Sequence, residues 1–125
     1  MKTLLCIIHS PSNNTSLIEQ KVSEKLKSET SNLNIIIKNP FFANTEDILK
    51  ADGLLIGTTE NLASMAGATK DFFDRNYYNV IEKKEGMPVA VWIRAGHDGT
   101  GTTIQMKSII TVSYTHLTLP TICSV

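Results

Sequence analysis

Four short apolar runs, separated by segments with helical periodicity, constrain the fold of this chain more than any other feature. The runs cover residues 2–9, 33–38, 51–57 and 87–95. Each has the length of a strand, and a nearly continuous apolar character is typical of strands buried on both faces of a parallel sheet. The sequence therefore predicts an α/β protein built around such a sheet.

Helices are predicted between these runs. The spacing of apolar residues predicts one helix over about 15–28 and a second that carries Phe72 and Phe73 and runs to about Lys84. Another begins with the residues IQMKSII at 104–110, whereas 39–50 are expected to form a loop with one helical turn. Strands that alternate with helices imply right-handed crossovers and a doubly wound, three-layer α/β/α arrangement.

Composition narrows the class of protein further. The 125 residues suit one domain, with 42% apolar and 19% charged residues. Twelve basic residues balance twelve acidic ones, so we expect neither nucleic acid nor a membrane surface as a partner. No apolar run approaches the about 20 residues needed to span a bilayer. The two cysteines indicate neither a disulfide framework nor a metal site, and we expect a cytoplasmic protein.

Three polar loops follow predicted strands, and in open α/β sheets ligands bind at the carboxyl ends of strands. The first loop, HSPSNNTS at 9–16, offers hydroxyls and amides just before a helix N-terminus, which suits a phosphate. The alternative is a helix start with more capping side chains than it needs. The loop has no Lys or Arg and no P-loop pattern, so a nucleoside triphosphate with magnesium is not expected.

The second and third loops are rich in small residues. Thr58 to Leu62 leave the third run, and the small residues at 63–68 allow a flat ligand to approach the backbone. The third loop, AGHDGTGTT at 95–103, has three glycines that permit close approach. Its His97 and Asp98 form either a catalytic pair or two exposed loop residues. The three loops together would hold one phosphate and the edges of a planar ring.

The segments HSPSNNTS, ADGLLIGTTENLASMAGATKDFFDR and PVAVWIRAGHDGTG resemble the flavodoxin-like family, and most of all its NAD(P)H-dependent FMN reductase and quinone reductase branch. The middle segment is the most specific, because it ends in the family pattern Lys-x-Phe-x-Asp-Arg. Thr59 stands where the family usually has proline, and Leu62 where an aromatic ring often stacks on the flavin. The resemblance covers residues 1–110 and implies the strand order 2-1-3-4, with the fifth strand missing or mimicked by the tail.

The resemblance also implies roles for individual residues. The FMN phosphate would be held by Ser10, Ser12, Asn13, Asn14 and Thr15. One side of the isoalloxazine ring would be flanked by Thr58, Glu60, Asn61, Leu62 and Ala63, and the other by Gly96, His97, Asp98 and Gly99. The motif residues Lys70, Phe72, Asp74 and Arg75 are interpreted as structural. No catalytic side chain and no metal are expected, because the flavin itself performs the chemistry.

In this interpretation, FMN accepts a hydride from NAD(P)H and passes electrons to a quinone or a similar small acceptor. A homodimer is one assembly that the sequence leaves open. The first alternative is a non-enzymatic flavodoxin-type electron carrier, although such carriers are typically strongly acidic and this chain is neutral. A response-regulator receiver is disfavoured because His9 and Ser10 stand where that family has an acidic pair. A truncated fragment without activity is the third alternative.

The last residues form a separate segment. Residues 112–125, VSYTHLTLPTICSV, resemble the translation of a transposase-end and adapter DNA used in sequencing libraries, which reads V-S-Y-T-H-L-T-L-P-T in one frame. We therefore expect residues 1–111 to form a C-terminally truncated FMN-binding domain and 112–125 to be a non-native tail. Strand-forming residues recur in this tail, so we expect it to lie along the free edge of the fourth strand or to stay irregular.

Overall fold

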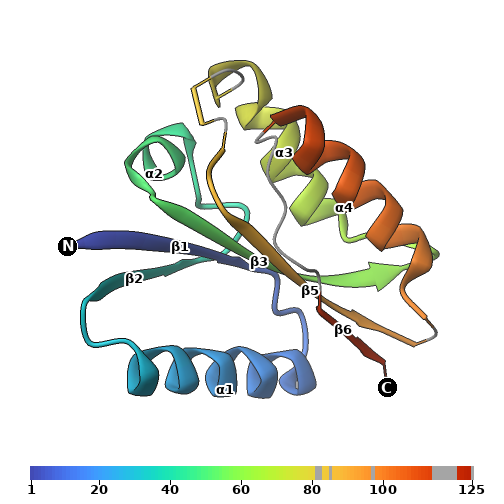
Figure 1. The fold of residues 1–125 in the computed structure, drawn as a ribbon. Helices are drawn as coiled ribbons and strands as arrows, with labels where there is room; N and C mark the ends of the chain where they lie inside the picture. The colour runs from blue at the N-terminus through green and yellow to red at the C-terminus, as the bar shows by residue number, and fades with distance from the viewer. Residues whose placement is uncertain (81–82, 85, 97, 114–120, 125) are drawn as a thin grey trace.

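A parallel sheet covered by helices on both faces organises the chain (Figure 1). The computed structural model describes residues 1–80, 83–84, 86–96, 98–113 and 121–124. The elements in chain order are β1 (Lys2–Ile8), α1 (Asn13–Glu29), β2 (Leu33–Lys38), α2 (Thr45–Lys50), β3 (Gly53–Asn61), β4 (Ser64–Met65), α3 (Gly67–Val80), β5 (Val89–Ala95), α4 (Thr100–Ser113) and β6 (Thr121–Ser124). All four apolar runs form strands, as predicted.

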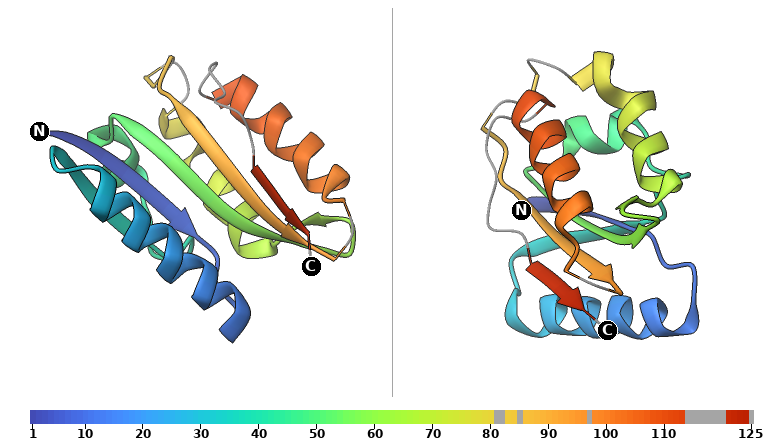
Figure 2. Two further views of the ribbon diagram at one scale, coloured as in Figure 1. Left: turned by 60° about the horizontal axis from the view of Figure 1, so that its bottom comes forward. Right: turned by 90° about the vertical axis from the view of Figure 1, so that its right-hand side faces the viewer.

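The strands pair in the order β2-β1-β3-β5-β6, and all of these pairs are parallel. The short strand β4 pairs antiparallel with the end of β3 and was not predicted. Without β4, the predicted order 2-1-3-4 is confirmed. The edge beside β5 is occupied by β6, which belongs to the predicted tail and pairs Trp92 with Thr121 (Figure 2).

The two faces of the sheet are covered unequally. Helix α1 lies alone on one face, whereas α2, α3 and α4 cover the other (Figures 1 and 2). Alternate residues of each strand point to opposite faces, so the two faces draw on different side chains. We call them the α1 face and the α3/α4 face.

The α3/α4 face carries the larger apolar cluster. Its largest members are fully buried side chains from strands and helices alike: Leu5, Ile7, Ile48, Leu54, Ile56, Phe72, Val80, Val89, Ile93, Met106 and Ile110. On the α1 face the buried cluster of the described residues consists of Cys6, Ile8 and Trp92, with partly buried residues such as Ile18 and Leu26 of α1 packed against it. Most of the burial that stabilises this chain is therefore on the α3/α4 face.

Three predicted boundaries are corrected by the structure. The third strand does not end at residue 57, because β3 continues to Asn61, where it pairs with β4. Helix α4 begins at Thr100, inside the segment predicted as a loop over 95–103. Helix α3 ends at Val80, and the described residues Lys83 and Lys84 are not helical, so the predicted end near Lys84 is too late. The first two of these differences depend on contacts between the β3–β4 hairpin and α4 that are described below.

The motif residues interpreted as structural do have structural contacts. Lys70 pairs with Asp74 at 2.6 Å, and the Arg75 side chain pairs with Asp71 at 2.7 Å, both along exposed positions of α3. The same guanidinium donates hydrogen bonds to the backbone carbonyls of Pro40 at 2.6 Å and Ala43 at 3.1 Å. Arg75 therefore fixes the loop that leads from β2 into α2.

Candidate functional site

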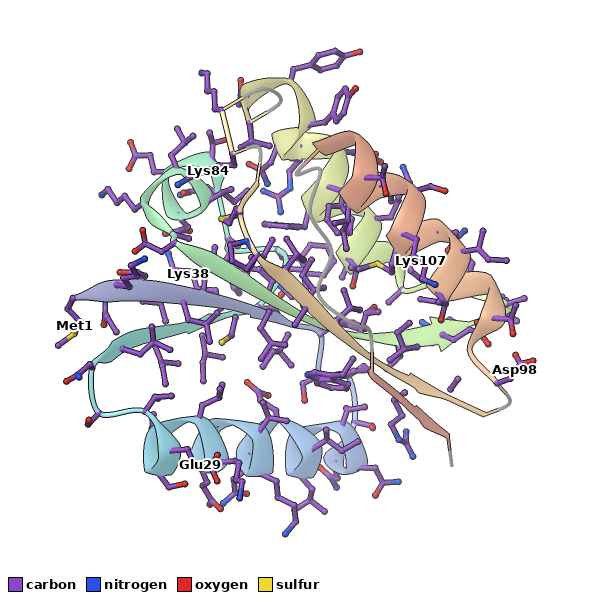
Figure 3. The ribbon with its side chains drawn as sticks, in the orientation of Figure 1. Met1, Glu29, Lys38, Lys84, Asp98 and Lys107 are labelled. Atoms are coloured by element: carbon purple, nitrogen blue, oxygen red, sulfur yellow. The ribbon has the colours of Figure 1, made fainter. Side chains whose placement is uncertain are left out.

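The three polar loops meet at one edge of the sheet. Strands β1, β3 and β5 are parallel neighbours, so their carboxyl ends point in the same direction (Figure 1). The start of α1, the β3–β4 hairpin and the start of α4 all lie at this edge. In Figure 3 the labelled residue Asp98 lies at the same end of the molecule, just beyond β5. The fold thus brings together the segments that contain the predicted site residues.

The first loop is organised by the cap of α1. Ser12 is the N-cap: its Oγ accepts a hydrogen bond from the Thr15 amide at 3.4 Å, while the Thr15 hydroxyl accepts one from the Ser12 amide at 3.0 Å. Ser10 and Ser16 join their hydroxyls at 3.0 Å. These side chains are therefore already engaged with one another, which is the alternative that the sequence left open for this loop.

Two backbone amides of the same loop remain available to a ligand. Asn13 and Asn14 are the first two residues of α1, so no carbonyl of the helix can reach their amides. Both are exposed, and α1 has no acidic residue in its first turn. Desolvation by burial lowers the pKa of the neighbouring His9, which favours its neutral form. The loop therefore offers neutral donors and the positive end of a helix dipole.

The second loop is a tight hairpin. Glu60 and Asn61 of β3 pair with Met65 and Ser64 of β4, so only Leu62 and Ala63 form the turn. Both have positive φ, at 53° and 63°, a combination that a two-residue type I′ turn requires and that side chains other than Gly, Asn and Asp rarely adopt. The Leu62 side chain is 101% exposed. A strained turn thus holds a fully exposed apolar side chain at the edge of the sheet.

Contacts with α4 hold this hairpin in place. The Glu60 carboxylate accepts a hydrogen bond from the Thr102 amide at 3.0 Å, and Gln105 Oε1 accepts one from the Met65 amide at 2.8 Å. Gln105 Nε2 also donates to the Ser64 hydroxyl at 2.9 Å. A Cβ on Gly101 would come within 2.2 Å of the Ala63 carbonyl oxygen, so this position needs glycine. The turn and α4 are therefore one packed unit.

The third loop is short because α4 begins early. Gly96 and Asp98 are exposed, and Asp98 Oδ1 accepts a hydrogen bond from the Thr100 amide at 3.0 Å. Gly99 is buried with φ of 70°. His97 lies outside the described residues, so the proposed His97–Asp98 pair is not described. The structure uses Asp98 to begin a helix.

Two adjacent threonines of β3 face opposite sides of the sheet. Thr58 points to α3, is completely buried and shares a 2.8 Å hydrogen bond with the Thr69 hydroxyl. Thr59 points to the α1 face and is 6% exposed, and its Oγ1 has no hydrogen-bond partner among the described residues. Of the two, Thr59 is the one whose hydroxyl is free for a ligand, whereas Thr58 is the one predicted from the sequence to flank the ring.

Trp92 also lies on the α1 face, in register with Gly57, two residues before Thr59. Its indole packs directly on Gly57, where a Cβ would come within 2.3 Å of the ring. The indole Nε1 is a donor without a partner in a side chain that is 6% exposed. Within the described residues, only Thr102 Oγ1 is a further buried side-chain oxygen or nitrogen without a partner. Such groups are uncommon in folded proteins and call for an explanation.

The structure separates most of the predicted site residues into two groups; of the others, Gly99 is buried and His97 lies outside the described residues. Those with exposed or unengaged groups at the edge are Asn13, Asn14, Asn61, Leu62, Ala63 and Gly96. Those whose polar side chains are engaged within the protein are Ser10, Ser12, Thr15, Thr58, Glu60 and Asp98. Thr59, Trp92 and Gln105 were not predicted as site residues. Only Thr59 had a signal in the sequence, since it lies within a motif whose usual residue there is proline.

Other chemically reactive groups lie elsewhere or are absent from the described residues. Desolvation by burial raises the pKa of the Cys6 thiol to about 11, so it is not a reactive thiolate. Among the described residues, no three His, Cys, Asp or Glu side chains cluster as metal ligands do. None of the helices in the described ranges is long and apolar enough to cross a membrane.

Comparison with known proteins gives one curated relative. A flavodoxin from Aquifex aeolicus (strain VF5) is 27% identical over 112 residues, which cover 90% of this chain and 60% of the flavodoxin. This chain therefore spans less than two thirds of the length of that relative. No family model matches the chain.

Solved structures give closer agreement in shape than in sequence. Two-electron reduced flavodoxin from Megasphaera elsdenii superposes with a TM-score of 0.79 at 13% sequence identity. The superposed region covers 95% of this chain and 84% of that flavodoxin. The apo form of an NADH:FMN oxidoreductase gives a TM-score of 0.78 at 14% sequence identity, and the match covers 98% of this chain and 75% of the oxidoreductase. Fusobacterium nucleatum flavodoxin bound to flavin mononucleotide gives a TM-score of 0.72 at 14% sequence identity, and the match covers 94% of this chain and 70% of that flavodoxin.

Proposed function

Since the chain has the flavodoxin-like α/β fold, we propose that it binds FMN at the carboxyl edge of its sheet and acts as an electron carrier. One observation carries the proposal: two buried donors, Thr59 Oγ1 and Trp92 Nε1, lack partners on the face where α1 begins. A bound ligand with acceptor oxygens would satisfy both. The curated relative is a flavodoxin, which favours the carrier over the reductase that the sequence analysis ranked first.

The phosphate of FMN matches the donors at the start of α1. The exposed amides of Asn13 and Asn14 and the dipole of α1 would hold it, as helix N-termini hold phosphates in other proteins. Thr59 would add its hydroxyl from β3. The capping hydroxyls of Ser12 and Thr15 keep the helix start in shape, which gives them an indirect role.

The ring of FMN matches the hairpin and the third loop. Asn61, Leu62 and Ala63 would lie along one side and Gly96 along the other, where little side-chain bulk blocks approach. Bound FMN supplies the redox chemistry, and the protein supplies position and hydrogen bonds. The exposed Leu62 side chain would cover apolar ring surface. Because Gln105 and Glu60 hold the hairpin on α4, the side chains beside the ring stay in a fixed position.

Flavin titration tests the proposal. FMN added to the purified chain should lose fluorescence and show shifted visible absorbance bands as it enters the folded protein. Unchanged emission and absorbance at micromolar protein, with circular dichroism of a folded α/β protein, would contradict the proposal.

The Ser12→Asp variant tests the phosphate position without removing the cap. Asp is as good an N-cap as Ser, so α1 should stay intact, while the new carboxylate repels a phosphate. FMN affinity should fall about tenfold or more because of this charge repulsion, with riboflavin affinity unchanged. Asn44→Asp, the same kind of change at the N-cap of α2, is the control. Equal losses for both flavins would place the phosphate elsewhere.

An NAD(P)H-dependent FMN or quinone reductase is the second candidate. The equal number of acidic and basic residues favours it, as does the similarity in shape to an NADH:FMN oxidoreductase. Anaerobic addition of NADH or NADPH to the flavin-loaded protein separates the two functions. Bleaching of the visible flavin bands within seconds would support the reductase. Bands that stay unchanged until a chemical reductant is added would support the carrier.

A further inference from the structure

Arg94 is a half-buried cation on the α1 face of the sheet. It lies on β5 two residues after Trp92, so both side chains point to the same face. Its Cα pairs in register with Thr59 of β3. Because β1, β3 and β5 are neighbours, Arg94 lies at the same edge as the start of α1, with one strand between β5 and β1.

Among the described residues, the guanidinium of Arg94 has no hydrogen-bond or ion-pair partner. A partly desolvated cation without a counter-charge is unfavourable, since burial of a charge is compensated only by pairing. The position therefore favours binding of an anion.

The groups around Arg94 are also donors. Thr59 Oγ1 and Trp92 Nε1 are buried without partners on this face, and the first amides of α1 lie at the same edge. The first acidic residue of α1 is Glu19, beyond the first turn. Asp98, in the loop after β5, is exposed and already accepts a hydrogen bond from the Thr100 amide. Glu60 points to the opposite face, toward α4.

We propose that Arg94 is the charged contact of an anion-binding subsite and makes the site select a phosphate monoester over a neutral ligand. The oxygens of one phosphate group would accept hydrogen bonds from Arg94 and from the donors at the α1 N-terminus. For FMN this inference rests on the proposed function. For inorganic phosphate it stands by itself.

Trp92 supplies a direct probe, because it is the only tryptophan of the chain. A protein labelled with ¹⁵N therefore gives a single indole N–H signal, and that group belongs to the proposed subsite. Titration with inorganic phosphate at constant ionic strength should shift this signal to saturation in the wild-type protein. Chloride at the same ionic strength should not.

Three variants assign the effect to Arg94. Arg94→Gln should abolish the phosphate-dependent shift and weaken FMN binding by about tenfold or more, with riboflavin affinity changed less than about twofold. Arg94→Lys should keep most of the FMN affinity because it keeps the charge. Lys107→Gln removes one positive charge from α4, on the opposite side of the sheet from α1 (Figure 3). This variant should change the binding of neither phosphate nor FMN.

The outcomes separate this inference from the proposed function. A phosphate shift that depends on Arg94, in a protein that binds no flavin, would support the subsite and contradict the FMN proposal. Normal FMN binding in Arg94→Gln, or an equal loss of FMN and riboflavin, would overturn the role of Arg94 while the FMN proposal stands. The absence of any phosphate shift in the wild-type protein would also overturn the subsite. If Arg94→Gln does not fold by circular dichroism, Arg94→Lys and the chloride comparison still decide.

Discussion

Thr58 and Thr59 are neighbours in β3 with opposite environments. Thr58 faces α3, where its hydroxyl is completely buried and bonded to Thr69. Thr59 faces α1, where its hydroxyl is nearly as buried but has no partner. The same side chain thus contributes to stability on one face and leaves an unsatisfied group on the other.

The contrast extends to the whole sheet. The α3/α4 face buries a large apolar cluster, and its polar groups beside the hairpin are mostly paired. The α1 face has a small cluster and holds Thr59, Trp92 and Arg94 with unpaired polar groups near the carboxyl edge. We infer that the first face provides stability and the second provides binding. Four substitutions test that division, from the largest expected effect to the smallest.

Phe72→Ala should have the largest effect on stability. Phe72 is completely buried in the α3/α4 cluster, and removal of a buried aromatic ring leaves a cavity that costs about 3–5 kcal/mol. Urea unfolding followed by circular dichroism measures the loss. Phe72→Leu, which keeps most of the volume, is the control. A loss below about 1 kcal/mol for the alanine variant would show that this face is not the main source of stability.

Gly101→Ala should cause the second-largest loss of stability. The new methyl group would meet the Ala63 carbonyl oxygen at 2.2 Å, so the hairpin or α4 must shift, at a cost of about 1–3 kcal/mol. Gly67→Ala is the matched control, because it also lies in the first turn of a helix and has no atom within 4 Å of the new Cβ. Equal unfolding midpoints for the two variants would contradict the tight contact between α4 and the hairpin.

Thr58→Val should destabilise the fold moderately. It removes one hydroxyl of the buried Thr58–Thr69 pair and leaves the other without its partner, which costs about 1–3 kcal/mol. Flavin and phosphate binding should be unchanged, since Thr58 faces away from α1. A variant with normal stability and weakened flavin binding would reverse the assignment of the two threonines.

Thr59→Val should have the smallest effect on stability. Replacement of an unsatisfied buried hydroxyl by a methyl group of similar shape should leave the free energy of unfolding unchanged or raise it by up to about 1 kcal/mol. Phosphate and FMN affinity should fall by about two- to tenfold with the lost hydrogen bond. A clear loss of stability in the absence of ligand would mean that Thr59 has a structural partner.

The sequence predicted that α1 begins in this polar loop, but it did not show whether the loop side chains cap the helix or bind a phosphate. The run of Ser, Asn and Thr at 10–15 predicted both a helix start and a phosphate loop. The structure selects Ser12 as the N-cap and joins it to Thr15, so these two hydroxyls serve the helix. The exposed residues Asn13 and Asn14, with their backbone amides, then remain for an anion. Local sequence does not show which side chains a cap will occupy.

The hairpin could not be predicted from its own residues. A two-residue turn with positive φ at both positions is signalled by Asn-Gly or Gly-Gly, and here Leu62 and Ala63 adopt it. The start of α4 was missed for a related reason, since Gly101 is a poor helix former. Each feature is stabilised by the other, through Gly101 against Ala63 and Gln105 against Met65.

The sequence by itself determined the alternation of strands and helices and hence the doubly wound sheet, because the periodicity of apolar residues reflects burial within each segment. Only the tertiary structure decided which polar groups lack partners. Whether Thr59 lies beside Arg94, or Trp92 on Gly57, depends on the register between strands far apart in the chain. A shift of one residue in that register would turn these side chains to different faces, so no local pattern in the sequence fixes them.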